Sequence, residues 1–258
     1  MPPSSPSRRA AAAGAPAPRA HRLYCEAPLS PGATVSLSER AARHATALRL
    51  RVGDPLTLFN GDGTESAAVL AAVGKRGVEA VVRTRVAVDR ESPLQTHLVQ
   101  GVCAADRMDL VLQKATELGV ASIRPVVTAR SVVRLAPERL ERREAHWRNV
   151  VIAACEQCGR NRIPELAAVL SFAQFAAAAP EAGTRLLLSP DADARLRHLA
   201  PTSPVHVLIG PEGGLAPEER RLALAAGFVP VRFGPRTLRT ETAPLAALAA
   251  LQALWGDC

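Results

Sequence analysis

Several features that would assign this chain of 258 residues to a function class are scarce or missing. Aromatic residues make up only 3%, so stacking on nucleic-acid bases cannot be a broad binding strategy. The five cysteines are an odd number without the spacing of a disulfide framework. No apolar run approaches the length of a membrane-spanning helix, so we expect no membrane partner.

Neither a metal site nor a phosphate-binding loop is indicated. Cys155-x-x-Cys158 is the most tempting cysteine pair, but zinc needs two more ligands, and no second Cys pair or nearby His pair exists. No loop combines the Gly, Lys and Ser/Thr of a phosphate cradle, and no Gly-x-Gly-x-x-Gly follows a predicted strand. We therefore expect no metal, and a nucleotide-dependent α/β enzyme is disfavoured.

Positive charge, by contrast, is in excess. The net charge is +8 and the pI is about 10.2, which favours a polyanionic partner. Residues 1–21 are rich in Pro, Ala, Ser and Arg and lack hydrophobic periodicity, so they predict a disordered basic tail. Arg8-Arg9 could open a twin-arginine export signal, but Gly14 and two prolines break the segment that follows. A cytoplasmic protein is the better interpretation.

The first predicted domain, residues 22–92, is rich in short strands. Strands over 56–59, 67–73 and 78–82 are separated by glycine-containing turns, a pattern typical of a small β-barrel. Ser36-Leu37-Ser38-Glu39 has the form of a capping box, which predicts one short helix beginning there.

A second domain is predicted over residues 93–258, with its boundary at Pro93. Strands alternate with helices beyond this point, which predicts an α/β domain with a mostly parallel sheet. Gly119 ends a predicted helix over 106–118, and apolar residues at helical spacing predict a long helix over 137–159.

Two loops rich in glycine and proline stand out in this second domain. The apolar strand 205–209 stops at Gly210-Pro211-Glu212-Gly213-Gly214, and the alternating strand 229–233 stops at residues 234–242. Open α/β sheets bind ligands at the carboxyl ends of their strands, and a third strand end, Leu188-Ser189-Pro190, is expected beside these loops. Glycines let the backbone approach a flat heterocycle, and Glu212 suits a cationic ligand better than a phosphate. Taken alone, the first loop could equally be a tight turn.

Together the two loops resemble those of the knotted SPOUT methyltransferases, and most closely the RsmE family, which methylates N3 of a uridine in small-subunit (16S) ribosomal RNA. In that family the second motif usually reads Leu-Gly-Pro-Arg-Ile-Leu-Arg-Thr-Glu-Thr-Ala, from which this chain departs at Phe233 and Thr237. Further stretches are similar to the family at 106–108, 113–120, 128–131 and 156–160, the last with Cys158 where Ser is usual.

The resemblance implies a fold and a set of partners. The fold would be an α/β SPOUT methyltransferase domain with a mostly parallel sheet and a C-terminal trefoil knot, preceded by a small PUA-like β-barrel that binds RNA. The cofactor would be S-adenosyl-L-methionine, which carries a sulfonium and no phosphate. The partners would be 16S ribosomal RNA in the small ribosomal subunit and a second copy of the chain, because family members are homodimers. The knot enters by resemblance alone, since true knots are rare.

Site residues follow from the loops and from the resemblance. The expected cofactor-binding residues are Leu188, Ile209, Gly210, Glu212, Gly213, Gly214, Phe233, Gly234, Leu238 and Thr242. The catalytic candidates are Arg239 or Arg160 to stabilise charge and Glu241 or Glu156 to accept a proton. The candidates for RNA contacts are Arg22, Arg49, Lys114, Arg130 and Arg160. Plainer alternatives stay open: Arg239 and Glu241 could merely brace the loop as an ion pair, and Lys114 could pair with Glu117 on one helix face.

The predicted terminal helix, residues 243–255, is apolar on more than one face, so it must be covered on several sides. A second subunit is a natural cover, and the alternative is packing on the chain's own sheet and on the 137–159 helix. The competing function is a non-catalytic RNA-binding protein with a degenerate methyltransferase fold. Intact glycines at 210, 214 and 234 argue against that alternative.

Overall fold

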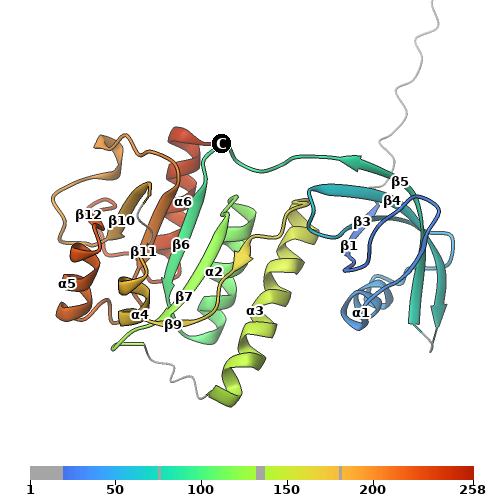
Figure 1. The fold of residues 1–258 in the computed structure, drawn as a ribbon, viewed down its shortest axis with the longest axis horizontal. Helices are drawn as coiled ribbons and strands as arrows, with labels where there is room; N and C mark the ends of the chain where they lie inside the picture. The colour runs from blue at the N-terminus through green and yellow to red at the C-terminus, as the bar shows by residue number, and fades with distance from the viewer. Residues whose placement is uncertain (1–19, 75–76, 132–136, 180–181) are drawn as a thin grey trace, which may run out of the picture.

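The computed structural model describes residues 20–74, 77–131, 137–179 and 182–258. These residues form two sheets, each with its own helices, connected by residues 88–95 (Figure 1). The predicted basic tail lies outside the described residues up to position 19, and its last predicted residue, His21, already begins strand β1.

The first sheet has five strands in the order β1-β3-β4-β5-β2. Its strands and helix are β1 (His21–Tyr24), β2 (Thr34–Ser36), α1 (Glu39–Ala47), β3 (Pro55–Phe59), β4 (Thr64–Gly74) and β5 (Gly77–Ala87). Gly61 and Gly63 take positive φ angles of 93° and 89° in the turn between β3 and β4, where a side chain would be strained. Leucines of β3 and β4 pack against α1 and form a separate small core.

Helix α1 begins later than the capping-box pattern predicted. Ser38, and not Ser36, is the N-cap, and its hydroxyl accepts a hydrogen bond from the Ala41 N–H at 3.3 Å. Ser36 is instead the last residue of β2 and lies opposite Glu79 of β5. Pairing of Ser36 with a distant strand thus overrides the local capping-box pattern and leaves Ser38 as the N-cap.

The second sheet has the strand order β12-β10-β11-β6-β7-β8, with β9 also pairing with β7. The elements of this half are β6 (Thr96–Gly101), α2 (Ala105–Glu117), β7 (Ser122–Val127), α3 (Pro137–Cys158), β8 (Glu165–Leu166), β9 (Leu170–Ser171), α4 (Phe172–Ala177), β10 (Thr184–Leu188), η1 (Leu196–His198), β11 (Val205–Ile209), α5 (Pro217–Ala225), β12 (Val229–Val231) and α6 (Thr242–Trp255). The pairs between these strands are parallel, which confirms the predicted sheet type.

The two strands that carry the special loops are not neighbours. Strand β10 lies between them, and its Leu187 is paired with Leu208 of β11 on one side and with Pro230 of β12 on the other. The strand that was expected beside the two loops therefore separates them. Because all three strands run parallel, their carboxyl ends still meet at one edge of the sheet.

Helices cover both faces of this second sheet (Figure 1). Helices α2, α3 and α6 pack on one face, where Val205, Val207 and Ile209 of β11 point. Helices α4 and α5 pack on the other face, against Leu208. A strand buried on both sides needs apolar residues at consecutive positions, which explains the run Val207-Leu208-Ile209 in β11.

Helix α3 joins the two halves of the molecule. Near its carboxyl end, Ile152 and Cys155 pack against Tyr24 and Phe59 of the first sheet in a small apolar cluster. Beside this cluster the buried carboxylate of Glu156 accepts hydrogen bonds from the first domain. The first domain is therefore fixed to α3 by both apolar and polar contacts.

Helix α6 buries one face in the chain's own core. Leu248 and Leu251 are fully buried, and α6 contacts α2, β6 and β11. Leu254 on another face is 53% exposed. The cover predicted for several sides of this helix is therefore partly supplied by its own subunit, at Leu248 and Leu251. Among the described residues, no helix is both long and apolar enough to cross a membrane.

Candidate active site

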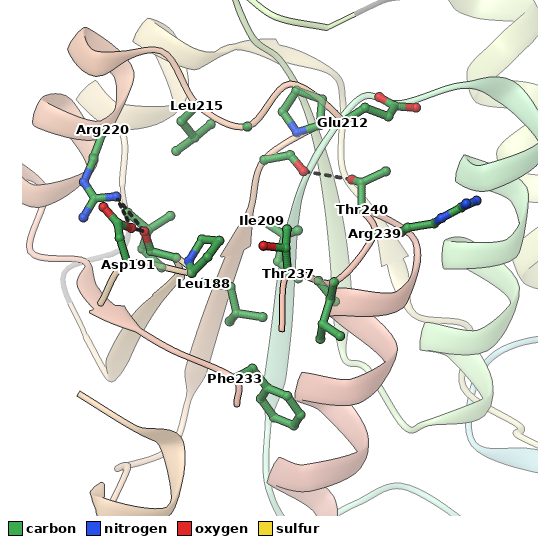
Figure 2. Close-up of a pocket in the computed structure, with 18 of the residues that line it drawn as sticks. Leu188, Asp191, Ile209, Glu212, Leu215, Arg220, Phe233, Thr237, Arg239 and Thr240 are labelled. Carbon is green, nitrogen blue, oxygen red and sulfur yellow. Dashed lines mark hydrogen bonds and ion pairs between the residues drawn. The ribbon is translucent and has the colours of Figure 1, made fainter. Parts of the chain in front are cut away.

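A cavity of about 510 Å³ opens at the carboxyl ends of β10, β11 and β12 (Figure 2). Its apolar lining consists of Leu187, Leu188, Ile209, Leu215, Phe233 and Leu238. The backbone of both special loops supplies polar groups around this apolar surface. A concave, mostly apolar cavity of this size is typical of a site for a small organic ligand or cofactor.

Glycines allow both loops to take their shapes. Gly214 and Gly234 have positive φ angles of 66° and 75°, and a Cβ built on either would meet no atom within 4 Å. Gly101, at the end of β6, is required for a different reason, because a Cβ there would lie 2.6 Å from Pro211. The first loop thus packs tightly on β6, while Gly214 leaves open space on the side of the cavity that it lines.

A threonine connects the two loops. The hydroxyl of Thr240 in the second loop donates a hydrogen bond to the carbonyl of Gly210 in the first loop at 2.8 Å (Figure 2). The same hydroxyl accepts a hydrogen bond from the side-chain amide of Gln100, which is fully buried at the end of β6. Sequence reasoning missed both residues, although a glutamine directly after the apolar pair Leu98-Val99 was a signal.

Glu212 in the first loop is already paired with a cation. One of its carboxylate oxygens accepts hydrogen bonds from the Ala104 N–H at 3.0 Å and from Arg107 at 2.9 Å. Burial alone would raise the pKa of Glu212, but the Ala104 N–H and the Arg107 guanidinium outweigh this effect and lower it. Glu212 is therefore ionised, and its charge is balanced from within the protein and is not left free for a cationic ligand.

Glu241 does not itself line the cavity but pairs with two arginines that do, Arg107 and Arg239. Its carboxylate oxygens lie 3.8 Å from Arg107 Nε and 3.9 Å from Arg239 Nη1, distances that make ion pairs without hydrogen bonds. Its Oε2 atom is buried and has no hydrogen-bond partner. Sequence reasoning named Arg239 and Glu241 but assigned no role to Arg107.

The opposite end of the cavity carries a separate polar group. Arg220 of α5 donates hydrogen bonds to Ser189 at 2.6 Å and to Asp191 at 3.0 Å, as Figure 2 shows. The hydrogen bond from Ser189, followed by that from Arg220, lowers the pKa of Asp191. No sequence signal marked Arg220, because an arginine on an exposed helix face usually indicates only a solvated surface.

The structure brings most of the predicted cofactor residues together. All of them line the cavity except Gly213, Gly234 and Thr242. The carbonyl of Gly213 accepts a hydrogen bond from Arg130 at 2.9 Å, so this RNA-binding candidate also anchors the first loop. Thr242 is exposed at the start of α6.

Two of the catalytic candidates, Arg160 and Glu156, lie outside this cavity. Arg160 is buried, donates to the carbonyls of Thr116 and Val120, and forms an ion pair with Glu91. Glu156 is buried against the first domain, where its carboxylate binds Arg40. Neither residue lines the cavity of its own subunit. Both make buried polar contacts that no local sequence pattern indicated.

The remaining RNA-binding candidates differ in how free they are. Lys114 forms an ion pair with Glu117 at 2.8 Å, which is the plainer of the two interpretations. Arg22 pairs with Glu65 at 2.7 Å and bonds Asn161 at 2.6 Å, so it too is largely committed. Arg49 is exposed, with a positive φ of 55°.

Neither a cluster of metal ligands nor the buried Cys103 and Cys155 supply a reactive centre in the described ranges. No three His, Cys, Asp or Glu side chains there converge as a metal site would require. Burial raises the pKa of Cys103 and of Cys155 to about 12, so both are neutral thiols at pH 7 and not nucleophiles.

Two family models match this sequence. Residues 90–252 match an RNA methyltransferase domain, and residues 37–83 match an RNA methyltransferase PUA domain. The chain belongs to the RNA methyltransferase family. This membership confirms the resemblance first indicated by the two loops.

Relatives of this family member match over nearly its whole length. A Buchnera aphidicola protein named ribosomal RNA small subunit methyltransferase E is 32% identical over 241 residues, which covers 93% of this chain and 98% of the relative. A structure of the protein of that name from Neisseria gonorrhoeae, bound to S-adenosylmethionine, is 40% identical with a TM-score of 0.85 and covers 92% of this chain and 99% of its own. A Legionella pneumophila structure in complex with the same cofactor is 41% identical with a TM-score of 0.89 and covers 93% and 100%.

Proposed function

We propose that this protein transfers a methyl group from S-adenosylmethionine to N3 of a specific uridine in 16S ribosomal RNA. One observation carries the proposal: the two loops typical of the family enclose an apolar cavity at the carboxyl edge of a parallel sheet. Relatives matched over almost the whole chain are named for methylation of small-subunit ribosomal RNA, and solved neighbours hold the same cofactor.

The residues present fit this cofactor. The apolar side chains Leu188, Ile209 and Phe233 suit a heterocycle, and the open side of Gly214 gives the ligand access to the backbone. When bound, S-adenosylmethionine supplies an electrophilic methyl group on a sulfonium. We extend the proposal to the topology: the segment from β11 to α6 forms the trefoil knot, and the first sheet closes as a PUA-like barrel, with the domain boundary at Pro93.

Glu241 and Arg239 are the proposed catalytic residues. The N3–H bond of uracil must break, and the buried Oε2 of Glu241 takes the proton because no other donor occupies it. The N3 electron pair then forms the bond to the methyl carbon, and the electrons of the methyl–sulfur bond remain on sulfur. Arg239, whose side chain is 79% exposed at the cavity mouth, stabilises the negative charge that develops on the uracil ring.

The partners follow from charge and from α6. Exposed basic residues such as Arg49 on the first domain and Arg130 beside the first loop bind phosphates and hold the RNA across both domains. The exposed side of α6 around Leu254 is covered by a second copy of the chain, which makes the protein a homodimer. We place its activity in the cytoplasm, where small ribosomal subunits assemble.

Transfer of a tritiated methyl group to small ribosomal subunits tests the proposal, followed by mass mapping of the modified nucleotide. We expect a single 3-methyluridine in 16S RNA. A protein that binds this RNA tightly but transfers no methyl group, and binds no S-adenosylmethionine by calorimetry, would support the non-catalytic alternative and overturn the proposal.

A further inference from the structure

Arg107 occupies a position that no other side chain at the cavity shares. It extends from the first turn of α2 and lines the cavity. It pairs with one carboxylate from each of the two loops. Its Nη1 atom lies 2.9 Å from Glu212, which follows β11, and its Nε atom lies 3.8 Å from Glu241, which precedes α6. These two glutamates are separated by almost thirty residues of chain, and Arg107 connects them.

We propose that Arg107 is the positioning residue that holds Glu241 ready to accept the uracil proton. This inference rests on the proposed function. Glu241 Oε2 is buried without a hydrogen-bond donor, and the guanidinium of Arg107 faces this oxygen at 3.8 Å. Arg239 alone is a poor anchor, because its side chain is 79% exposed and its guanidinium faces the other carboxylate oxygen at 3.9 Å.

Glu212 in turn positions the guanidinium of Arg107 by accepting a hydrogen bond from it. The Ala104 N–H and Arg107 bind the same oxygen of Glu212, so the first loop is held to the start of α2 and the guanidinium is oriented toward Glu241. A guanidinium is a planar fork that can address two carboxylates at once, whereas the ammonium of lysine is a point charge. Arg107 therefore acts through Glu241, and Glu212 acts through Arg107.

Kinetics of methyl transfer to small ribosomal subunits test the inference, with Arg107→Ala, Arg107→Lys and Glu212→Gln compared with the wild type. We expect kcat to fall on the order of 100-fold in Arg107→Ala, since this removes the support of an acid–base group. Arg107→Lys should recover about tenfold of that loss because it restores the charge but not the fork. Because Arg107 lines the cavity, kcat is measured at saturating S-adenosylmethionine, and the melting temperature should stay near wild type. Arg221→Ala, which removes an exposed arginine paired with Glu218 outside the cavity, is the matched control and should change nothing.

A double variant sharpens the test. If Glu212 acts only through Arg107, Arg107→Ala combined with Glu212→Gln should be no slower than Arg107→Ala alone, whereas independent roles would multiply the two losses. Wild-type kcat in Arg107→Ala, or multiplied losses in the double variant, would overturn the inference. Should the alanine variant not fold, Arg107→Lys decides: a tenfold lower kcat supports the inference, and a wild-type kcat refutes it. An inactive wild type would instead refute the proposed function.

Discussion

Replacing Glu156 by Gln separates the structural role of this residue from the catalytic role that its sequence motif suggested. The side chain of Glu156 is 3% exposed, and its two oxygens accept hydrogen bonds from Arg40 at 2.6 and 3.0 Å and from the Tyr24 N–H at 2.9 Å. His44 lies 3.4 Å from the same carboxylate. All of these donors belong to the first domain, so the carboxylate is the polar centre of the joint between the two domains.

The expected loss of stability follows from the donors that glutamine cannot serve. The amide nitrogen of the introduced glutamine would face the Arg40 guanidinium, so that two hydrogen-bond donors would oppose each other. Arg40 would also lose its negatively charged partner. Removing one partner of a buried pair costs about 3–5 kcal/mol, but Arg40 is 21% exposed and glutamine keeps one acceptor oxygen. We therefore expect a loss of about 2 kcal/mol, which for a chain of this size lowers the melting temperature by roughly 4–8 °C.

Thermal unfolding followed by circular dichroism measures this loss, and methyl transfer is assayed well below the transition. Glu39→Gln is the matched control, because the Glu39 side chain is 94% exposed and pairs with Arg43 at 3.4 Å on the surface. That change should cost less than about 0.5 kcal/mol. The structural reasoning would be refuted by a Glu156→Gln protein that melts like the wild type but has lost methyl transfer, since Glu156 would then be catalytic.

Three further outcomes are expected. Gly214→Arg should abolish S-adenosylmethionine binding by calorimetry, because a long side chain at this cavity-lining position would fill the cavity, while the left-handed backbone costs only about 1–2 kcal/mol and the protein stays folded. Unchanged affinity would place the ligand elsewhere. Leu254→Glu should give a monomer by light scattering, whereas Leu248→Glu, fully buried in its own subunit, should unfold the chain; a monomeric wild type that still methylates RNA would refute the dimer. Burial and a neighbouring histidine lower the pKa of His206 from 6.5 to about 4. The folded state therefore binds fewer protons than the unfolded chain in that window, so stability should be full above pH 6.5 and fall toward pH 4, by no more than about 1 kcal/mol per pH unit after allowance for partial exposure. His206→Gln should flatten this slope in chemical denaturation.

Features that depend on neighbouring residues were predictable from the sequence. Pro217 begins α5 and a positive φ of 78° at Gly227 follows its end, as their positions predicted. The long helix was expected over 137–159 and spans Pro137–Cys158. The glycines of the two loops also predicted a ligand site. Glycine is the residue that most readily takes a positive φ and lets the backbone approach a ligand closely.

Only the tertiary structure shows which charged groups line the cavity. Arg160 and Arg107 both lie in stretches similar to the family. Arg160 is buried and donates to two backbone carbonyls, whereas Arg107 lines the cavity and pairs with two glutamates. The same holds for β10, whose insertion between β11 and β12 is a pairing between segments far apart in the chain. Periodicity and turn chemistry are local and can be derived from a sequence. The partner of a charge depends on distances between residues far apart in the chain, and only the folded packing determines those distances.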